Sequence, residues 1–189
     1  MKYILLGTYK TKPENRGWYI NRSQYSILWE KINSKFNTEY TFKDCNYDGF
    51  FGRIGSINNF LFYDIKTFDP SLEGETDDKF VFEVKKDDFK AGLHKLIEEI
   101  KSNPKINYRI GLQGNNVTGL FLNYLHDPKR LDKVKLQTLS RDFKIPFGKI
   151  TNVSCPNNIQ LFKIYNLTQQ RKKGDWKVNF HKTWEEFLT

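Results

Sequence analysis

The sequence predicts an α/β fold: a three-layer α/β/α sandwich around a central, mainly parallel sheet of about four strands. Short apolar segments alternate along the chain with longer segments whose apolar residues recur at helical spacing. Such an alternation is typical of a parallel sheet that helices cover on both faces. Because the chain shows no internal repeat and no linker, we expect one domain over residues 1–189.

The N-terminal third predicts two of the strands and one helix. Residues 3–6 form a short apolar strand, and residues 60–65 form a second one after a Gly/Asn-rich stretch. Ser23 is a plausible N-cap for a helix between them. The apolar face of this helix contains Tyr25, Leu28, Trp29, Ile32 and Phe36. Residues 69–79 are acidic and rich in turn formers, so we expect a surface loop there.

A second helix, a third strand and a third helix follow. Asp87 or Asp88 caps the second helix, and Pro104 ends it. Its apolar stripe contains Phe89, Leu93, Leu96, Ile97 and Ile100. Residues 108–113 are the next strand, and Gly114 opens a helix that carries Val117, Leu120, Phe121, Tyr124 and Leu125.

The C-terminal part predicts one strand and one helix, preceded by a segment with two possible structures. The Lys/Arg-rich residues 127–149 are compatible with either a helix or a long loop. Residues 159–167 alternate like a strand. Asp175 caps a last helix, whose inner face contains Trp176, Phe180, Trp184, Phe187 and Leu188.

The composition narrows the class of partner. Lysine plus arginine outnumber the acids by 31 to 22, which gives a net charge of +9. This excess favours phosphate polymers or anionic surfaces, although it also serves solubility alone. The two cysteines lack paired spacing and the three histidines are scattered, so we expect no disulfide framework and no metal. No apolar run approaches the roughly 20 residues of a membrane span, and residues 3–6 are too short for a signal peptide, so we expect a cytoplasmic protein.

The sequence lacks the motifs of several common enzyme classes. The chain contains no GxGxxG after a strand, no GxxxxGK[ST], no GxSxG and no HExxH. Their absence argues against a Rossmann dehydrogenase, a P-loop NTPase, an α/β-hydrolase and a zincin.

Candidate functional groups gather instead where the predicted strands end, at residues 8–10, 64–67, 113–116 and 168–173. Right-handed crossovers place these exits along one edge of the sheet, where ligands bind in open α/β folds. Gly7 admits a close ligand, while Tyr9 and Lys10 suit a base and a phosphate. A solvated turn explains the same residues. Asp64 is either a general base or a helix-capping acid, and the cap is favoured.

The order of these segments resembles the uracil-DNA glycosylase superfamily, closest to its mismatch-specific and hypoxanthine-type branches. Residues 3–9 (YILLGTY), Trp18-Tyr19 and residues 24–29 (QYSILW) are similar to the family's opening strand, aromatic pair and helix. Residues 62–67 and 107–115 are similar to its second and third strands with the loops that follow. The tail from residue 162 to Trp184 corresponds to its last strand, DNA-intercalating loop and closing helix.

The resemblance implies hydrolysis of the N-glycosidic bond of uracil or hypoxanthine flipped out of duplex DNA, by a monomer without a cofactor. Gln24 or Asn21 would position the attacking water. The base pocket would be lined by Gly7, Thr8, Tyr9, Trp18, Tyr19 and Asp64. The DNA contacts would come from Lys10, Thr168, Gln169, Gln170, Arg171, Lys172 and Lys173.

Two departures from the family pattern keep other functions open. Tyr9 stands where mismatch-specific members carry Asn, and the final loop lacks the family's Pro-Ser or His-Pro-Ser. These departures favour a catalytically inactive nucleic-acid-binding protein on the same fold. An unrelated doubly wound enzyme for a small molecule is the third hypothesis.

Overall fold

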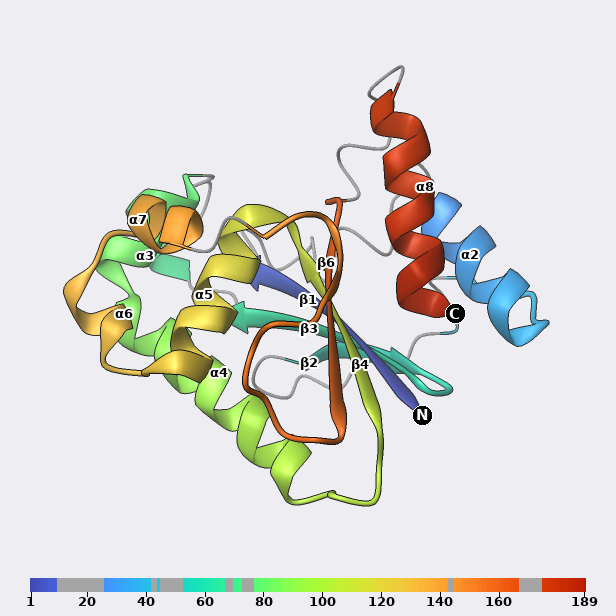
Figure 1. Ribbon diagram of the computed structural model, residues 1–189, viewed down its shortest axis with the longest axis horizontal. Coiled ribbons are helices and arrows are strands. Elements are labelled where there is room, and N and C mark those ends of the chain that lie inside the picture. The colour runs from blue at the N-terminus through green and yellow to red at the C-terminus, as the bar shows by residue number, and fades with distance from the viewer. Residues whose placement is uncertain are drawn as a thin grey trace.

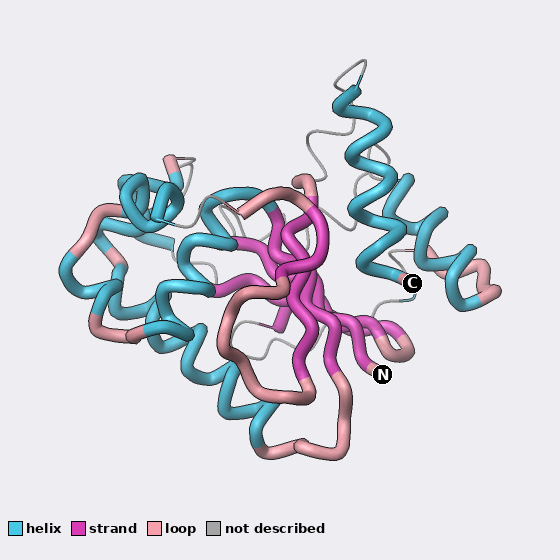
Figure 2. Tube along the Cα trace, in the orientation of Figure 1, coloured by secondary structure: helices cyan, strands magenta, loops and turns pink. Residues whose placement is uncertain are grey.

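The centre of the molecule is a sheet with helices packed on both sides (Figure 1). A computed structural model describes residues 1–9, 26–41, 44, 53–66, 70–72, 77–142, 145–166 and 175–189. Three layers are visible in the trace coloured by secondary structure (Figure 2). The predicted α/β/α architecture is therefore confirmed.

The described residues form a six-stranded sheet in the order β2-β3-β1-β4-β6-β5. The strands are β1 (Lys2–Tyr9), β2 (Arg53–Ile57), β3 (Phe60–Lys66), β4 (Tyr108–Gln113), β5 (Gly148–Ile150) and β6 (Ile159–Ile164). The four inner strands, β3, β1, β4 and β6, pair in parallel and correspond to the four that the sequence predicts. The edge strands β2 and β5 pair antiparallel and were not expected.

The helices cover the two faces unequally. The longer ones are α2 (Ser26–Phe36), α4 (Lys86–Lys101), α5 (Gly114–His126) and α8 (Asp175–Leu188). The shorter ones are α3 (Asp78–Val84), α6 (Arg130–Lys133) and α7 (Leu136–Asp142). In Figure 1, α2 and α8 lie on one side of the sheet, and α3 to α7 lie on the other.

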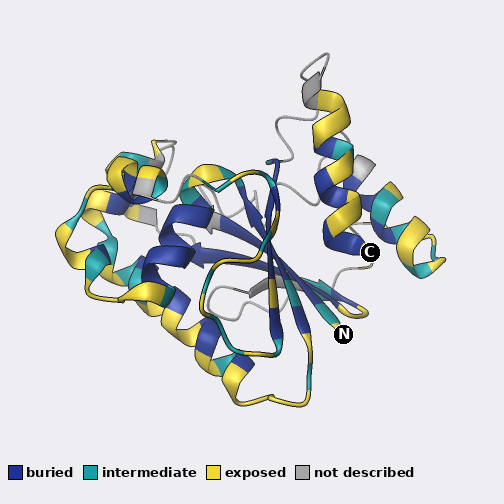
Figure 3. Cartoon of the chain, viewed as in Figure 1, coloured by how far each residue is buried: buried dark blue, intermediate teal, exposed yellow. Residues whose placement is uncertain are grey.

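Each face of the sheet has its own hydrophobic core. Buried residues run along the strands and the inner faces of the helices (Figure 3). On the α2/α8 face, aromatic rings of Tyr3, Phe60, Phe162 and Phe187 pack against one another. The stripe predicted on the second helix, from Phe89 to Ile100, is buried in the other core. Alternate strand residues therefore point to different cores, as period-two geometry requires.

Several predicted boundaries were wrong. α4 begins at Lys86 after Lys85, so Asp87 and Asp88 lie in its first turn and do not cap it. An acidic residue interacts favourably with the helix dipole both at the N-cap and in the first turn. The sequence alone therefore does not distinguish these two positions. α3 occupies the end of the predicted 69–79 loop, and Asp77 caps it through the backbone nitrogen of Lys79.

In the described part of 127–149, the region predicted as either helix or loop, two short helices form and β5 begins. The last strand, β6, ends at Ile164 and is shorter than predicted. Ser23, the predicted cap of the first helix, and the residues just before α8 lie outside the described residues.

Arg109 ties the end of α8 to the sheet. Its Nε donates to the Phe187 carbonyl at 2.8 Å, another guanidinium nitrogen donates to the Glu186 carbonyl, and the group lies 4.4 Å from the Phe162 ring centroid. These bonds satisfy carbonyls that the helix itself leaves unpaired.

We expect Arg109→Ala to lower the free energy of unfolding by about 2–3 kcal/mol, because charge-assisted bonds and a cation–π contact are lost together. Arg109→Lys should recover only part of this, since an ammonium cannot reproduce the guanidinium fork. Urea denaturation followed by circular dichroism measures both. A loss below about 0.5 kcal/mol for Arg109→Ala, the level of an ordinary surface substitution, would contradict this role.

Candidate ligand site at the carboxyl edge of the sheet

The chain changes direction in the sheet between β1 and β4. From β1 it passes through α2 on one face toward β3, and from β4 it passes through α5 on the other face toward β6. In open α/β sheets, ligands bind outside the carboxyl ends of the strands at this kind of switch point. The ends of β1 and β4 therefore define the candidate site.

β1 extends further than predicted. The strand was expected to end at residue 6, but Gly7 pairs with Asp64 and Tyr9 pairs with Lys66. The strand continues because β3 runs to Lys66 and offers partners along its whole length. Gly7 therefore lies within the ladder, beside Asp64, and not in a loop after the strand.

Asp64, Gly7 and Gln113 form a row across three neighbouring strands, which we call the polar row. Gly7 is opposite Asp64, and the pairing of Leu6 with Leu112 places Gly7 level with Gln113. Positions two residues earlier in β1 and β3 belong to the core under α2 and α8. By strand alternation, the polar row faces that same side. Gly7, the middle member of the row, contributes no side chain between Asp64 and Gln113.

Asp64 is 2 % exposed, so it is a buried carboxyl group within β3. Its place within β3 means that it is not the N-cap residue of any helix among the described residues, which corrects the favoured sequence reading. The helical segments after β3 begin at Pro70 and Asp78, and Asp77 caps the latter. Close by, Lys66 is buried and forms an ion pair with Asp88 at 3.0 Å.

Gln113 is the residue at this edge that the predicted base pocket missed. The sequence placed it at a strand exit, but nothing in the sequence distinguishes its amide from a solvated one. The side chain is 5 % exposed, and among the described residues Nε2 has no hydrogen-bond partner. Gln113 precedes α5 without capping it through its side chain.

The structure brings together two of the predicted pocket residues, Gly7 and Asp64, and places the backbone of Thr8 and Tyr9 in the same strand. The other predicted site residues lie outside the described residues. They are Lys10, Trp18, Tyr19, Asn21, Gln24, Thr168, Gln169, Gln170, Arg171, Lys172 and Lys173. By sequence, they belong to the two connections that leave β1 and β6 and lead to α2 and α8.

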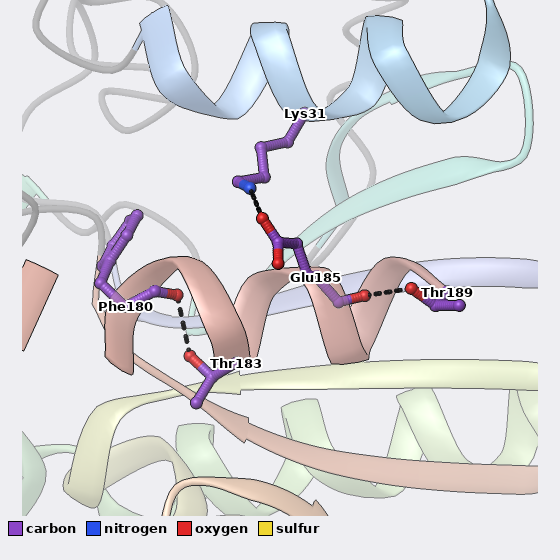
Figure 4. A network of polar contacts seen from close by, with 5 residues as sticks. All are labelled: Lys31, Phe180, Thr183, Glu185 and Thr189. Carbon is purple, nitrogen blue, oxygen red and sulfur yellow. Dashed lines mark hydrogen bonds and ion pairs between the residues drawn. The ribbon is translucent and has the colours of Figure 1, made fainter. Parts of the chain in front are cut away.

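The two helices on this face of the sheet, α2 and α8, are linked to each other. Lys31 of α2 donates to Glu185 of α8 at 2.7 Å, and this bond lowers the pKa of the Glu185 carboxyl (Figure 4). Within α8 and at its end, the Thr183 and Thr189 hydroxyls donate to backbone carbonyls of Phe180 and Glu185. The ion pair therefore joins α2 to α8.

A pocket of about 580 Å³ lies between α4, α5 and the segment before β6, and is a weaker candidate. Its polar groups bond to one another: His94 Nδ1 lies 2.8 Å from the Tyr124 hydroxyl, and Lys101 donates to Glu98. Burial raises the pKa of the Cys155 thiol, which keeps it in the unreactive protonated form.

Within the described ranges, no group of three or more His, Cys, Asp or Glu side chains is arranged to hold a metal ion. None of the helices in that part of the chain is long and apolar enough to cross a membrane. No protein-family model matches the chain, and no curated protein matches it.

Proposed function

We propose that this chain is a DNA glycosylase that hydrolyses the N-glycosidic bond of uracil or hypoxanthine flipped out of DNA. The observation that carries the proposal is the polar row at the switch point, where a buried carboxyl group lies beside a glycine. A flat ring can approach the sheet backbone closely only where no side chain intervenes. The resemblance of the order of segments along the chain to the uracil-DNA glycosylase superfamily supports the same assignment.

In this mechanism a water oxygen bonds to the sugar C1′ while the bond from C1′ to the base nitrogen breaks. The base leaves with the electron pair, and the sugar passes through an oxocarbenium-like state. Gln24 or Asn21 orients the water, and Asp64 accepts its proton. Tyr9, Trp18 and Tyr19 supply the stacking surface for the base.

The charge of the chain supports a nucleic-acid substrate. With a net charge of +9, the protein attracts a polyanion, and its affinity for DNA should fall steeply with salt. Lys10 and the run from Arg171 to Lys173 are the proposed phosphate contacts.

A second candidate is a nucleic-acid-binding protein without catalysis. One observation favours it: Tyr9, which replaces the Asn of the mismatch-specific branch, is held in the ladder opposite Lys66. In this candidate the pocket binds an extruded base and lacks the group that orients water.

The test is base release from DNA duplexes that carry uracil, hypoxanthine or a mismatched base, read by alkaline strand cleavage, with DNA binding measured in parallel. Release above background from at least one substrate supports the glycosylase. Binding without release across the panel supports the second candidate. If the protein neither binds nor releases a base from any of these duplexes, both candidates are rejected.

Gln24→Ala should abolish base release while leaving DNA affinity nearly unchanged, because only water positioning is removed. Asn21→Ala, measured in the same way, decides which of the two amides has the role. An equal loss of release and binding in the Gln24 variant would contradict the assignment and indicate a structural role instead.

A further inference from the structure

Asp64 has to be ionised to accept a proton in the proposed mechanism, but its burial opposes ionisation. The side chain is 2 % exposed, and moving a carboxyl group from water into a protein interior raises its pKa. A buried carboxylate therefore needs a positive charge nearby to stay ionised at neutral pH. The end of β3 contains such a charge.

Lys66 is a buried lysine two residues further along the same strand. It is 5 % exposed, and alternation along β3 places it on the same face of the sheet as Asp64, about 7 Å away between Cα atoms. Its ammonium lies 3.0 Å from the carboxylate of Asp88, in the first turn of α4. The Asp88 side chain is 47 % exposed, so water screens its charge more strongly than that of Lys66.

Other charged or titratable groups lie in the elements around β3. They are Tyr9 in β1, Arg53 in β2, Lys86 and Asp87 at the start of α4, and the Lys31–Glu185 ion pair that joins α2 to α8. In the helices these groups are oppositely charged neighbours, so their fields largely cancel. Arg53 is one strand away, opposite Tyr63, and is the cation with which Lys66 has to be compared.

We propose that Lys66 is a positioning residue whose charge keeps Asp64 ionised, and that Asp88 weakens this effect by pairing with Lys66. The inference rests on the proposed function and adds an electrostatic control to the same site. The Lys66–Asp88 pair thereby sets the lowest pH at which Asp64 can accept the proton of the attacking water. Removing the two charges should therefore have opposite effects.

The test measures the pKa of Asp64 in the full chain by NMR of isotope-labelled carboxyl carbons, with Asp64→Asn to assign the signal. In Lys66→Met the pKa should rise by roughly one unit, the effect of a charge about 10 Å away at an effective dielectric constant of about 20. Lys66→Arg should stay near the wild-type value, because the positive charge is retained. Asp88→Asn should lower the pKa by roughly a few tenths of a unit, since the charge that it removes is screened.

Two control variants remove a positive charge elsewhere. Lys90→Met breaks the ion pair with Asp132 between α4 and α6, and should leave the pKa of Asp64 unchanged. Arg53→Met should shift this pKa less than Lys66→Met does. A larger shift in the Arg53 variant, or no measurable shift in Lys66→Met, overturns the inference. If Lys66→Met does not fold, Asp88→Asn decides: an unchanged or raised pKa of Asp64 in that variant also overturns it.

The pH dependence of base release separates this inference from the proposed function. The acidic limb of the single-turnover rate should move with the pKa of Asp64, to higher pH in Lys66→Met and to lower pH in Asp88→Asn. A limb that stays fixed while the pKa of Asp64 moves would overturn the role of Lys66 and leave the glycosylase standing. If wild-type protein releases no base but the pKa of Asp64 responds as expected, the proposed function fails and the coupling between Lys66 and Asp64 is supported.

Discussion

Gly92→Ala should lower the free energy of unfolding by about 3 kcal/mol or more. A Cβ at position 92 would lie 1.8 Å from the Ile65 carbonyl oxygen and 3.0 Å from its carbon. Both clashes are with backbone, and both elements, α4 and β3, are regular and packed. Relief therefore requires moving the helix away from the strand. Ile65 lies between Asp64 and Lys66, so the shift would also disturb the polar row.

Equilibrium denaturation in urea measures this loss, and Gly114→Ala is the matched control. At Gly114 a Cβ meets no atom within 4 Å, so only the strain of φ 76° remains, about 1–2 kcal/mol. A Gly92→Ala variant within 1 kcal/mol of wild type would show that α4 does not pack as closely on β3 as the structure indicates.

The parallel centre of the fold was predictable because its strands and helices have strong periodicity. Residues 108–113 and Gly114 mark the end of β4 and the start of α5 as the structure has them. The strands are buried on both faces, so their apolar runs are unambiguous. The helices that cover them carry apolar stripes long enough to define their inner faces.

The edge strands and short helices were not predictable for identifiable reasons. β2 includes Gly55 and Ser56, and its register shifts between Arg53 and Gly55, so it lacks an alternating pattern. β5 is only three residues long. α3 starts in an acidic stretch that resembles a loop, and its inward residues Val81 and Phe82 are too few for a periodic signal.

The site was predictable to the extent that strand exits mark an edge of the sheet. The sequence predicts Gly7 and Asp64 separately as pocket residues, and the strand register places them side by side. Gln113 lies at one of the predicted strand exits, but the sequence does not assign it to the pocket, because an unpaired amide is a property of the packed structure. The sequence therefore predicts which edge of the sheet to consider, whereas burial and hydrogen bonding are known only from the packed structure.

Asp64→Asn should slow base release at least about 100-fold, with DNA affinity within roughly threefold of wild type. A general base contributes about 10²–10⁴-fold to such a reaction, and an amide of the same shape cannot accept the proton. The affinity for DNA should stay nearly unchanged, because the Asp64 carboxyl group is buried and does not contact the DNA phosphates in the proposed complex. Single-turnover release from a uracil or hypoxanthine duplex, with binding measured by anisotropy, gives both numbers.

Asp87→Asn is the matched control, since it removes the same charge from an exposed position in the first turn of α4. It should leave release unchanged. If Asp64 only hydrogen-bonds the base, the loss in Asp64→Asn will stay below about 10-fold, the value of one neutral hydrogen bond. That result would mean that another group accepts the proton and that Asp64 contributes to the pocket only by hydrogen bonding. Unchanged release in a folded Asp64→Asn variant would remove the polar row from the mechanism, because its only acidic member would then be dispensable.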